Sequence, residues 1–140
     1  MKTLFSISVL TLLLCAVPSQ SFALIGIGYV SKERAKELGV TFRTHTNGAA
    51  GIQVWLEFKT EGELKKITYI ELQIGEAERP DLSVSLPVSY STPGKGVVSF
   101  SAYPAYLSKS TLRIVVYGGP KGDVGYLFKV KDFIDLEKPG

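Results

Sequence analysis

Residues able to carry out acid–base or nucleophilic catalysis are few in this chain. The one histidine, His45, lies in the run 44–48, whose threonine, asparagine and glycine residues favour a turn. A serine nucleophile would need a histidine and an acid beside it, and the sequence has no G-x-S-x-G motif to present such a serine. We therefore expect His45 to be an exposed loop residue, and we predict no catalytic residue.

Two glutamates, Glu57 and Glu71, fall on strands expected to be neighbours, and glycoside hydrolases work through paired carboxylates. In a hairpin centred near Gly62, however, the two glutamates stand two ladder steps apart instead of opposite each other. Nothing in the sequence indicates that either is buried enough to have the raised pKa that an acid catalyst needs. We expect solvated charges on a sheet face, which makes a small secreted hydrolase the remotest functional alternative.

No metal ion and no cofactor are expected. A transition-metal site usually needs several histidine or cysteine ligands, and the chain has one of each, His45 and Cys15. Glu76, Glu78 and Asp81 gather around a proline but lack the alternating acids and the turn glycine of a known calcium loop. We interpret them as a solvated acidic turn. The glycine runs of the chain lack the other residues of a nucleotide-binding loop.

One group of large side chains departs from the solvent-facing pattern. Trp55 lies in the polar phase of its strand, and the hairpin centred near Gly62 places Tyr69 directly opposite it, with Ile67 nearby. Exposed aromatic patches usually mark a contact surface. One interpretation, which an ordinary stable domain favours, is that the N-terminal segment with its short helix covers this patch. The functional interpretation is that Trp55, Tyr69 and Ile67 form an exposed platform for a sugar ring, a peptide or a partner protein.

The strands that position these residues are expected because apolar and polar residues alternate with a period of two. The clearest run is 52–59, where one face carries Ile52, Val54, Leu56 and Phe58. Further strands are expected at 66–75, 82–91, 97–103, 111–117 and 126–130, and less regular ones at 24–30 and 40–46. Pro87 cannot donate a backbone hydrogen bond, so its strand is expected at a sheet edge or with a bulge.

A short helix is expected between the first two strands. Ser31 is a good N-cap, residues 32–38 are mostly helix formers, and Gly39 suits the position after the helix end. Its apolar residues are Ala35 and Leu38, and a helix of two turns is marginal unless it docks on the sheet.

Short strands that each have one apolar face can bury those faces when two sheets pack face to face. We predict an all-β, two-sheet antiparallel sandwich, immunoglobulin-like or fibronectin-III-like, with seven to eight strands and one short N-terminal helix. A closed barrel is the second possibility. The cysteine and core-tryptophan spacing of antibody domains is absent.

The first 23 residues have the order of regions found in a signal peptide. Lys2 precedes an apolar run at 4–17, and Ser21 and Ala23 supply the small residues that signal peptidase accepts. The run is too short to span a bilayer, so we expect no stable membrane insertion after cleavage. Lipid attachment at Cys15 is the weaker alternative, because a leucine precedes it. The predicted organisation is a signal peptide at 1–23 and one domain at 24–140.

Composition narrows the function classes. The full chain has a net charge of +3, and one unit less without Lys2, which is too balanced to favour nucleic acid or an anionic membrane. Cys15 is the only cysteine, so the domain is expected to be disulfide-free. We predict a secreted or periplasmic, non-catalytic module for binding or protein interaction, whose partner is another envelope protein or a glycan. The alternative is a structural or assembly subunit of an envelope complex; the sequence does not indicate the oligomeric state.

Overall fold

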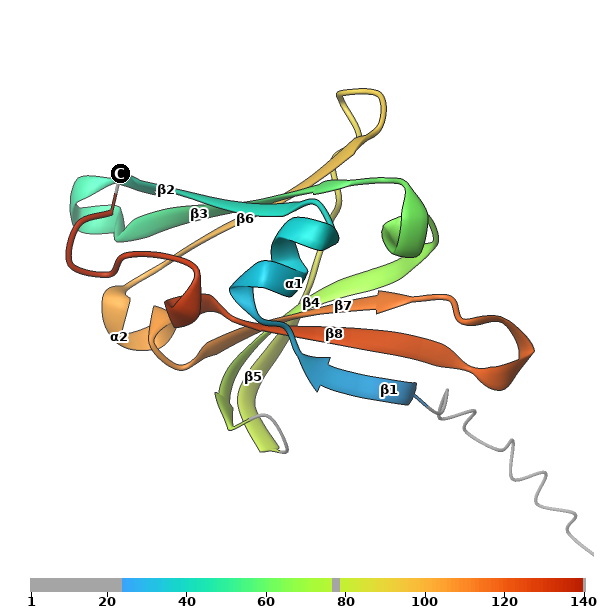
Figure 1. Ribbon diagram of the computed structural model, residues 1–140. Coiled ribbons are helices and arrows are strands. Elements are labelled where there is room, and N and C mark those ends of the chain that lie inside the picture. Colours follow the sequence, from blue (N-terminus) through green and yellow to red (C-terminus); the bar gives the residue numbers. More distant parts are fainter. Residues whose placement is uncertain (1–23, 77–78, 140) are drawn as a thin grey trace, which may run out of the picture.

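The structure, a computed structural model, consists mainly of two facing β-sheets (Figure 1). It describes residues 24–76 and 79–139, so the predicted leader at 1–23 lies outside the described residues. The larger sheet has five strands in the order β1-β8-β7-β4-β5, and the smaller has three in the order β2-β3-β6. The mostly β, two-sheet architecture expected from the alternating pattern is confirmed.

The large sheet contains β1 (Leu24–Tyr29), β8 (Asp123–Lys129), β7 (Ser110–Val116), β4 (Ile67–Glu76) and β5 (Arg79–Leu86). The small sheet contains β2 (Val40–Thr46), β3 (Ile52–Lys59) and β6 (Lys95–Ala102). The helices are α1 (Lys32–Glu37) and α2 (Pro104–Leu107), and the 3-10 turns are η1 (Gly48–Ala50), η2 (Gly62–Leu64), η3 (Gly119–Lys121) and η4 (Val130–Asp132). The second helix, α2, was not expected from the sequence.

The core lies between the two sheets. Strand β3 has the predicted phase, since its apolar residues are buried while the residues between them are partly exposed. A stack of phenylalanines joins the two sheets at one side, with ring centroids 6.0 Å apart for Phe42 and Phe128 and 4.8 Å apart for Phe42 and Phe133. Such aromatic contacts add to the free energy gained by burying apolar area.

Helix α1 forms where the sequence predicts it and docks into the core. The Ser31 hydroxyl caps it by accepting a hydrogen bond from the Arg34 N–H at 3.1 Å. Ala35 and Leu38 are buried in the cluster that fills the space between the sheets, as the position of α1 in Figure 1 illustrates. Gly39 follows with φ of 69°, a conformation that favours glycine at a helix end.

Strands β3 and β4 do not form the hairpin that the sequence analysis assumed. Strand β3 pairs with β2 and β6, whereas β4 pairs with β5 and β7 in the other sheet. Between them, η2 buries Leu64 in the core and carries the chain from one sheet to the other. The predicted pairing of Trp55 with Tyr69 is therefore wrong. Alternation identifies the buried face of a strand but not its neighbour.

The expectation of purely antiparallel sheets is wrong at one pair. Strand β1 runs parallel to β8, with Tyr29 beside Leu127. The chain can make this pairing because α1 and β2 carry it to the small sheet directly after β1, and β8 arrives much later from β7. As a result, the last residues of β1 and β8 lie at the same end of the large sheet.

Candidate functional site

The three residues of the predicted aromatic platform do not share a surface. Trp55 is half-buried on the outer face of the small sheet, where its strand neighbours are Arg43 and Ser99. Tyr69 is on β4 of the large sheet, in the phase opposite to the buried core residues of that strand, and Ile67 packs against the core. Trp55 and Tyr69 thus lie on the two opposite outer faces of the molecule. Helix α1 does not cover Trp55, because α1 packs into the core on the other side of β3.

The Trp55 ring is accompanied by charge. The Arg43 guanidinium lies 5.8 Å from the ring centroid, a cation–π geometry, and also forms an ion pair with Glu57. Arg43 and Glu57 occupy part of the space around the tryptophan, which leaves less of the ring free for a ligand than an isolated surface tryptophan would have.

The candidate catalytic groups are not brought together. His45 is exposed as expected, but it lies in strand β2 and not in a loop. Glu57 is on the small sheet, whereas Glu71 is on the large sheet, where it accepts a hydrogen bond from the Ser83 hydroxyl and lies 3.7 Å from Arg113. Within the described ranges there is no cluster of three or more His, Cys, Asp or Glu side chains that could hold a metal ion. Glu78, from the acidic turn, lies outside those ranges.

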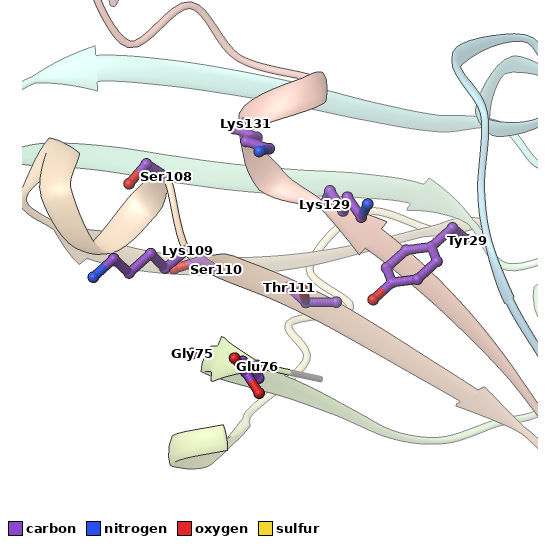
Figure 2. A pocket seen from close by; sticks show the side chains of 9 residues that line it. All are labelled: Tyr29, Gly75, Glu76, Ser108, Lys109, Ser110, Thr111, Lys129 and Lys131. Carbon is purple, nitrogen blue, oxygen red and sulfur yellow. The ribbon is translucent and has the colours of Figure 1, made fainter. Parts of the chain in front are cut away.

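A different group of mostly polar residues surrounds a pocket of about 260 Å³ at the end of the large sheet where β1 and β8 stop (Figure 2). We call it the lysine pocket. Its lining consists of Tyr29, Gly75, Glu76, Ser108, Lys109, Ser110, Thr111, Lys129 and Lys131.

The parallel pairing of β1 and β8 creates one wall of the lysine pocket. Tyr29 is the last residue of β1 and Lys129 the last of β8, so their side chains lie next to each other in Figure 2. The Lys129 ammonium lies 4.4 Å from the centroid of the Tyr29 ring. Tyr29 is 54% exposed, which leaves the residue accessible for a second contact. Lys131 follows in η4, two residues after Lys129.

The opposite wall is held by hydrogen bonds around the start of β7. The Ser110 hydroxyl donates to the carbonyl oxygen of Tyr106 in α2 at 2.8 Å. The N–H of Gly75, near the end of β4, donates to the carbonyl oxygen of Lys109 at 3.0 Å. Ser110 and Thr111 are buried, whereas the lysines are exposed. The pocket therefore combines a hydrogen-bonded frame with exposed lysine side chains at its rim.

The charges of the lysine pocket favour an anion. Three ammonium groups, from Lys109, Lys129 and Lys131, are opposed by a single carboxylate, Glu76. Lysine binds carboxylate, sulfate and phosphate groups as a point charge, and nearby hydroxyls can complete the hydrogen bonds. Histidine and cysteine are absent from the described lining residues.

Sequence reasoning missed this site because its residues come from four separate parts of the chain. The alternation of Lys129 and Lys131 was the one local signal, and it describes any solvent-facing strand equally well. Only the parallel pairing of β1 and β8 brings Tyr29 to Lys129.

A second polar cluster has a structural role. The Tyr126 hydroxyl of β8 donates to the Glu63 carboxylate at 2.5 Å, and Arg34 of α1 donates to the same carboxylate at 2.5 and 2.6 Å. These hydrogen bonds hold the pKa of Glu63 below its usual value, and the bond from Tyr126 has a larger effect than the bond from Arg34. Partial burial, together with the bond to Glu63, raises the pKa of Tyr126 to about 12. The cluster ties α1 and η2 to the large sheet.

In the part of the chain that the structure covers, no helix has both the length and the apolar character needed to cross a bilayer. Comparison of the chain with models of known protein families finds no matching family, and comparison with curated proteins finds no matching protein.

Proposed function

We propose that this chain is an exported, non-catalytic β-sandwich module of the cell envelope or exterior that binds an anionic glycan in the lysine pocket. The observation that carries the proposal is a pocket lined by three lysines, by an exposed tyrosine whose ring lies beside the Lys129 ammonium, and by the buried hydroxyl residues Ser110 and Thr111. Lysines would pair with carboxylate or sulfate groups of the glycan, and Tyr29 would pack against a sugar ring, since flat amphipathic rings bury area at low entropic cost.

We also propose that the sandwich is of the immunoglobulin-like or fibronectin-III-like type. The strand order supports this: β2-β3-β6 correspond to the A-B-E sheet, and β8-β7-β4-β5 correspond to the G-F-C sheet extended by C′. Domains of this type commonly present binding surfaces at the ends of their sheets, and the lysine pocket lies at such an end. This part of the proposal rests on fold analogy.

The experiment measures binding of the protein, recovered after export under its own leader, to three polymers. Polygalacturonate carries carboxylates, dextran sulfate carries sulfates, and neutral dextran is the reference. We expect binding to at least one anionic polymer, weakened by salt because exposed charges are screened. Comparison of binding to the two anionic polymers shows whether the protein recognises carboxylate or sulfate groups.

The decisive variant replaces Lys109, Lys129 and Lys131 with glutamine. Its matched control replaces three other exposed lysines, Lys65, Lys95 and Lys121, so that the net charge changes equally. Loss of three exposed charge pairs is expected to weaken binding by about tenfold or more in the pocket variant, and by much less in the control. Equal losses in both variants would show unspecific charge attraction and contradict the proposal, as would binding to neutral dextran of the same strength.

A further inference from the structure

Strand β5 offers an open edge at one side of the large sheet. Within the described residues it pairs with β4 along one side and has no partner strand on the other. An open edge presents unpaired backbone donors and acceptors, which natural proteins usually block with lysines, bulges or prolines. Here Pro80 and Pro87 mark the two ends of the free edge, and the sequence between them contains no lysine.

The same strand carries unusual apolar exposure. Among the described residues, the large hydrophobic side chains that are exposed are tyrosines and two aliphatic residues, Leu82 at 50% and Val84 at 41%. Leu82 pairs with Ile74 and Val84 with Leu72, so both share the face that is turned toward the small sheet. They are exposed nonetheless, because the small sheet has fewer strands and leaves β5 uncovered.

The sequence of β5 is self-complementary. Residues 82–86 read Leu-Ser-Val-Ser-Leu in either direction. A twofold axis at Val84, perpendicular to the sheet, would pair two copies antiparallel, with Val84 opposite itself and Leu82 opposite Leu86 of the second copy. Serines would then face serines on one side of the sheet and apolar side chains would meet on the other. Cross-strand pairs of matching type are the unit of sheet stabilisation.

Charge also permits this pairing. The charged residues of β5 are Arg79 and Asp81, both toward one end of the strand. With Val84 at the centre, Asp81 falls opposite Pro87 and Arg79 opposite Ser89 of the second copy, so no like charges oppose each other.

We propose that β5 is a homodimerisation edge, at which two copies of this chain join their large sheets into one continuous sheet. The occupant is a second copy because the palindrome matches itself. A strand pair of this length buries less than the roughly 1,600 Å² of a standard interface, so the dimer should form in a concentration-dependent way. No residue of β5 lines the lysine pocket, so the two proposals can be tested separately.

Sedimentation velocity over about 1 to 500 µM tests the oligomeric state, a range that covers weak interfaces. We expect wild type to shift from monomer to dimer and Val84→Lys to stay monomeric, because the twofold axis would place two ammonium groups side by side. The matched control is Thr41→Lys, an equal charge change at an exposed position of β2, the edge strand of the small sheet, and it should dimerise like wild type. Circular dichroism melts establish that both variants are folded.

A cysteine scan tests the register and does not depend on Val84→Lys. In a Cys15→Ser background, the introduced cysteine is the only one in the chain. With diamide as oxidant, Val84→Cys should form a disulfide-linked dimer, whereas Leu82→Cys alone should not. Leu82→Cys mixed with Leu86→Cys should link the two chains to each other.

Three outcomes would overturn the proposal. The first is a wild-type protein that remains monomeric over the whole concentration range. The second is a folded Val84→Lys protein that dimerises as wild type does. The third is a cross-linking pattern in which Leu82→Cys links to itself more readily than Val84→Cys, because that requires a different register. Loss of glycan binding in the lysine-pocket variant, with dimerisation intact, would leave this inference standing.

Discussion

The packing of Phe58 over Gly96 gives the sharpest stability prediction. Gly96 on β6 is the register partner of Phe58 on β3, and the phenylalanine is 1% exposed. A Cβ added at Gly96 would lie 2.9 Å from Cε1 of that ring and closer still to Cε2 and Cζ. Carbon atoms in contact prefer about 3.5 to 4.0 Å, so the ring would have to move by roughly 1 Å inside a packed core.

The expected effect of Gly96→Ala is the difference between two terms. Overpacking a core costs about 1 to 3 kcal/mol, whereas removing glycine from the unfolded chain stabilises by about 0.4 to 1 kcal/mol. The overpacking term is larger, so we expect the free energy of unfolding to fall by about 1 to 2 kcal/mol. For a domain of this size that corresponds to a Tm about 4 to 8 °C lower.

Gly28→Ala is the matched control. Gly28 lies in β1 outside the left-handed region, and an added Cβ would meet no heavy atom within 4 Å. Only the unfolded-state term applies, so this variant should be neutral or stabilised by up to about 1 kcal/mol. The two alanine substitutions are therefore expected to have opposite signs in urea unfolding measured by circular dichroism.

A double-mutant cycle assigns the cost to the ring. Phe58→Leu removes Cε1, Cε2 and Cζ, so in that background Gly96→Ala should cost little, with a coupling energy of about 1 to 2 kcal/mol. The reasoning is refuted if Gly96→Ala is as stable as Gly28→Ala, or if its cost is the same with and without the Phe58 ring.

Three further predictions concern other parts of the molecule. Trp55 is half-buried, so Trp55→Ala should cost about 1 to 2 kcal/mol, between a core and a surface replacement, and its fluorescence should be partly quenched by acrylamide; a loss above about 3 kcal/mol would place it in the core. The pKa of Glu63 is lowered in the folded state, so the stability it contributes is present above its usual value of 4.5 and is lost as pH falls through the folded pKa. Urea midpoints should therefore decline less steeply on acidification in Glu63→Gln than in wild type, and parallel curves would contradict the assigned role. Intact mass of the exported protein should correspond to a chain beginning at Leu24, and a species that retains Met1 or carries lipid at Cys15 would contradict the predicted cleavage.

The sequence alone identified the local features of this fold. The phase of β3 followed from strict alternation, because one face of a strand is buried and the other is not. The N-cap at Ser31 and the glycine after α1 predicted where that helix begins and ends, because the backbone N–H and C=O groups at helix ends need partners outside the helix. The strand expected at 82–91 runs instead from Arg79 to Leu86, so Pro87 follows the strand rather than lying within it, although β5 is an edge strand.

Only the tertiary structure decided which strands are neighbours, and with them the surfaces. Residues 52–59 and 67–76 alternate equally well as partners in a hairpin or as members of opposite sheets, and the burial of Leu64 in η2 selects the second arrangement. That choice separates Trp55 from Tyr69. The lysine pocket also depends on strand pairing, since the parallel pairing of β1 with β8 brings together the ends of two strands that lie about a hundred residues apart in the sequence. Alternation with a period of two predicts which face of a strand is buried. Which strands pair depends on all the strands of the chain, so no local pattern predicts it.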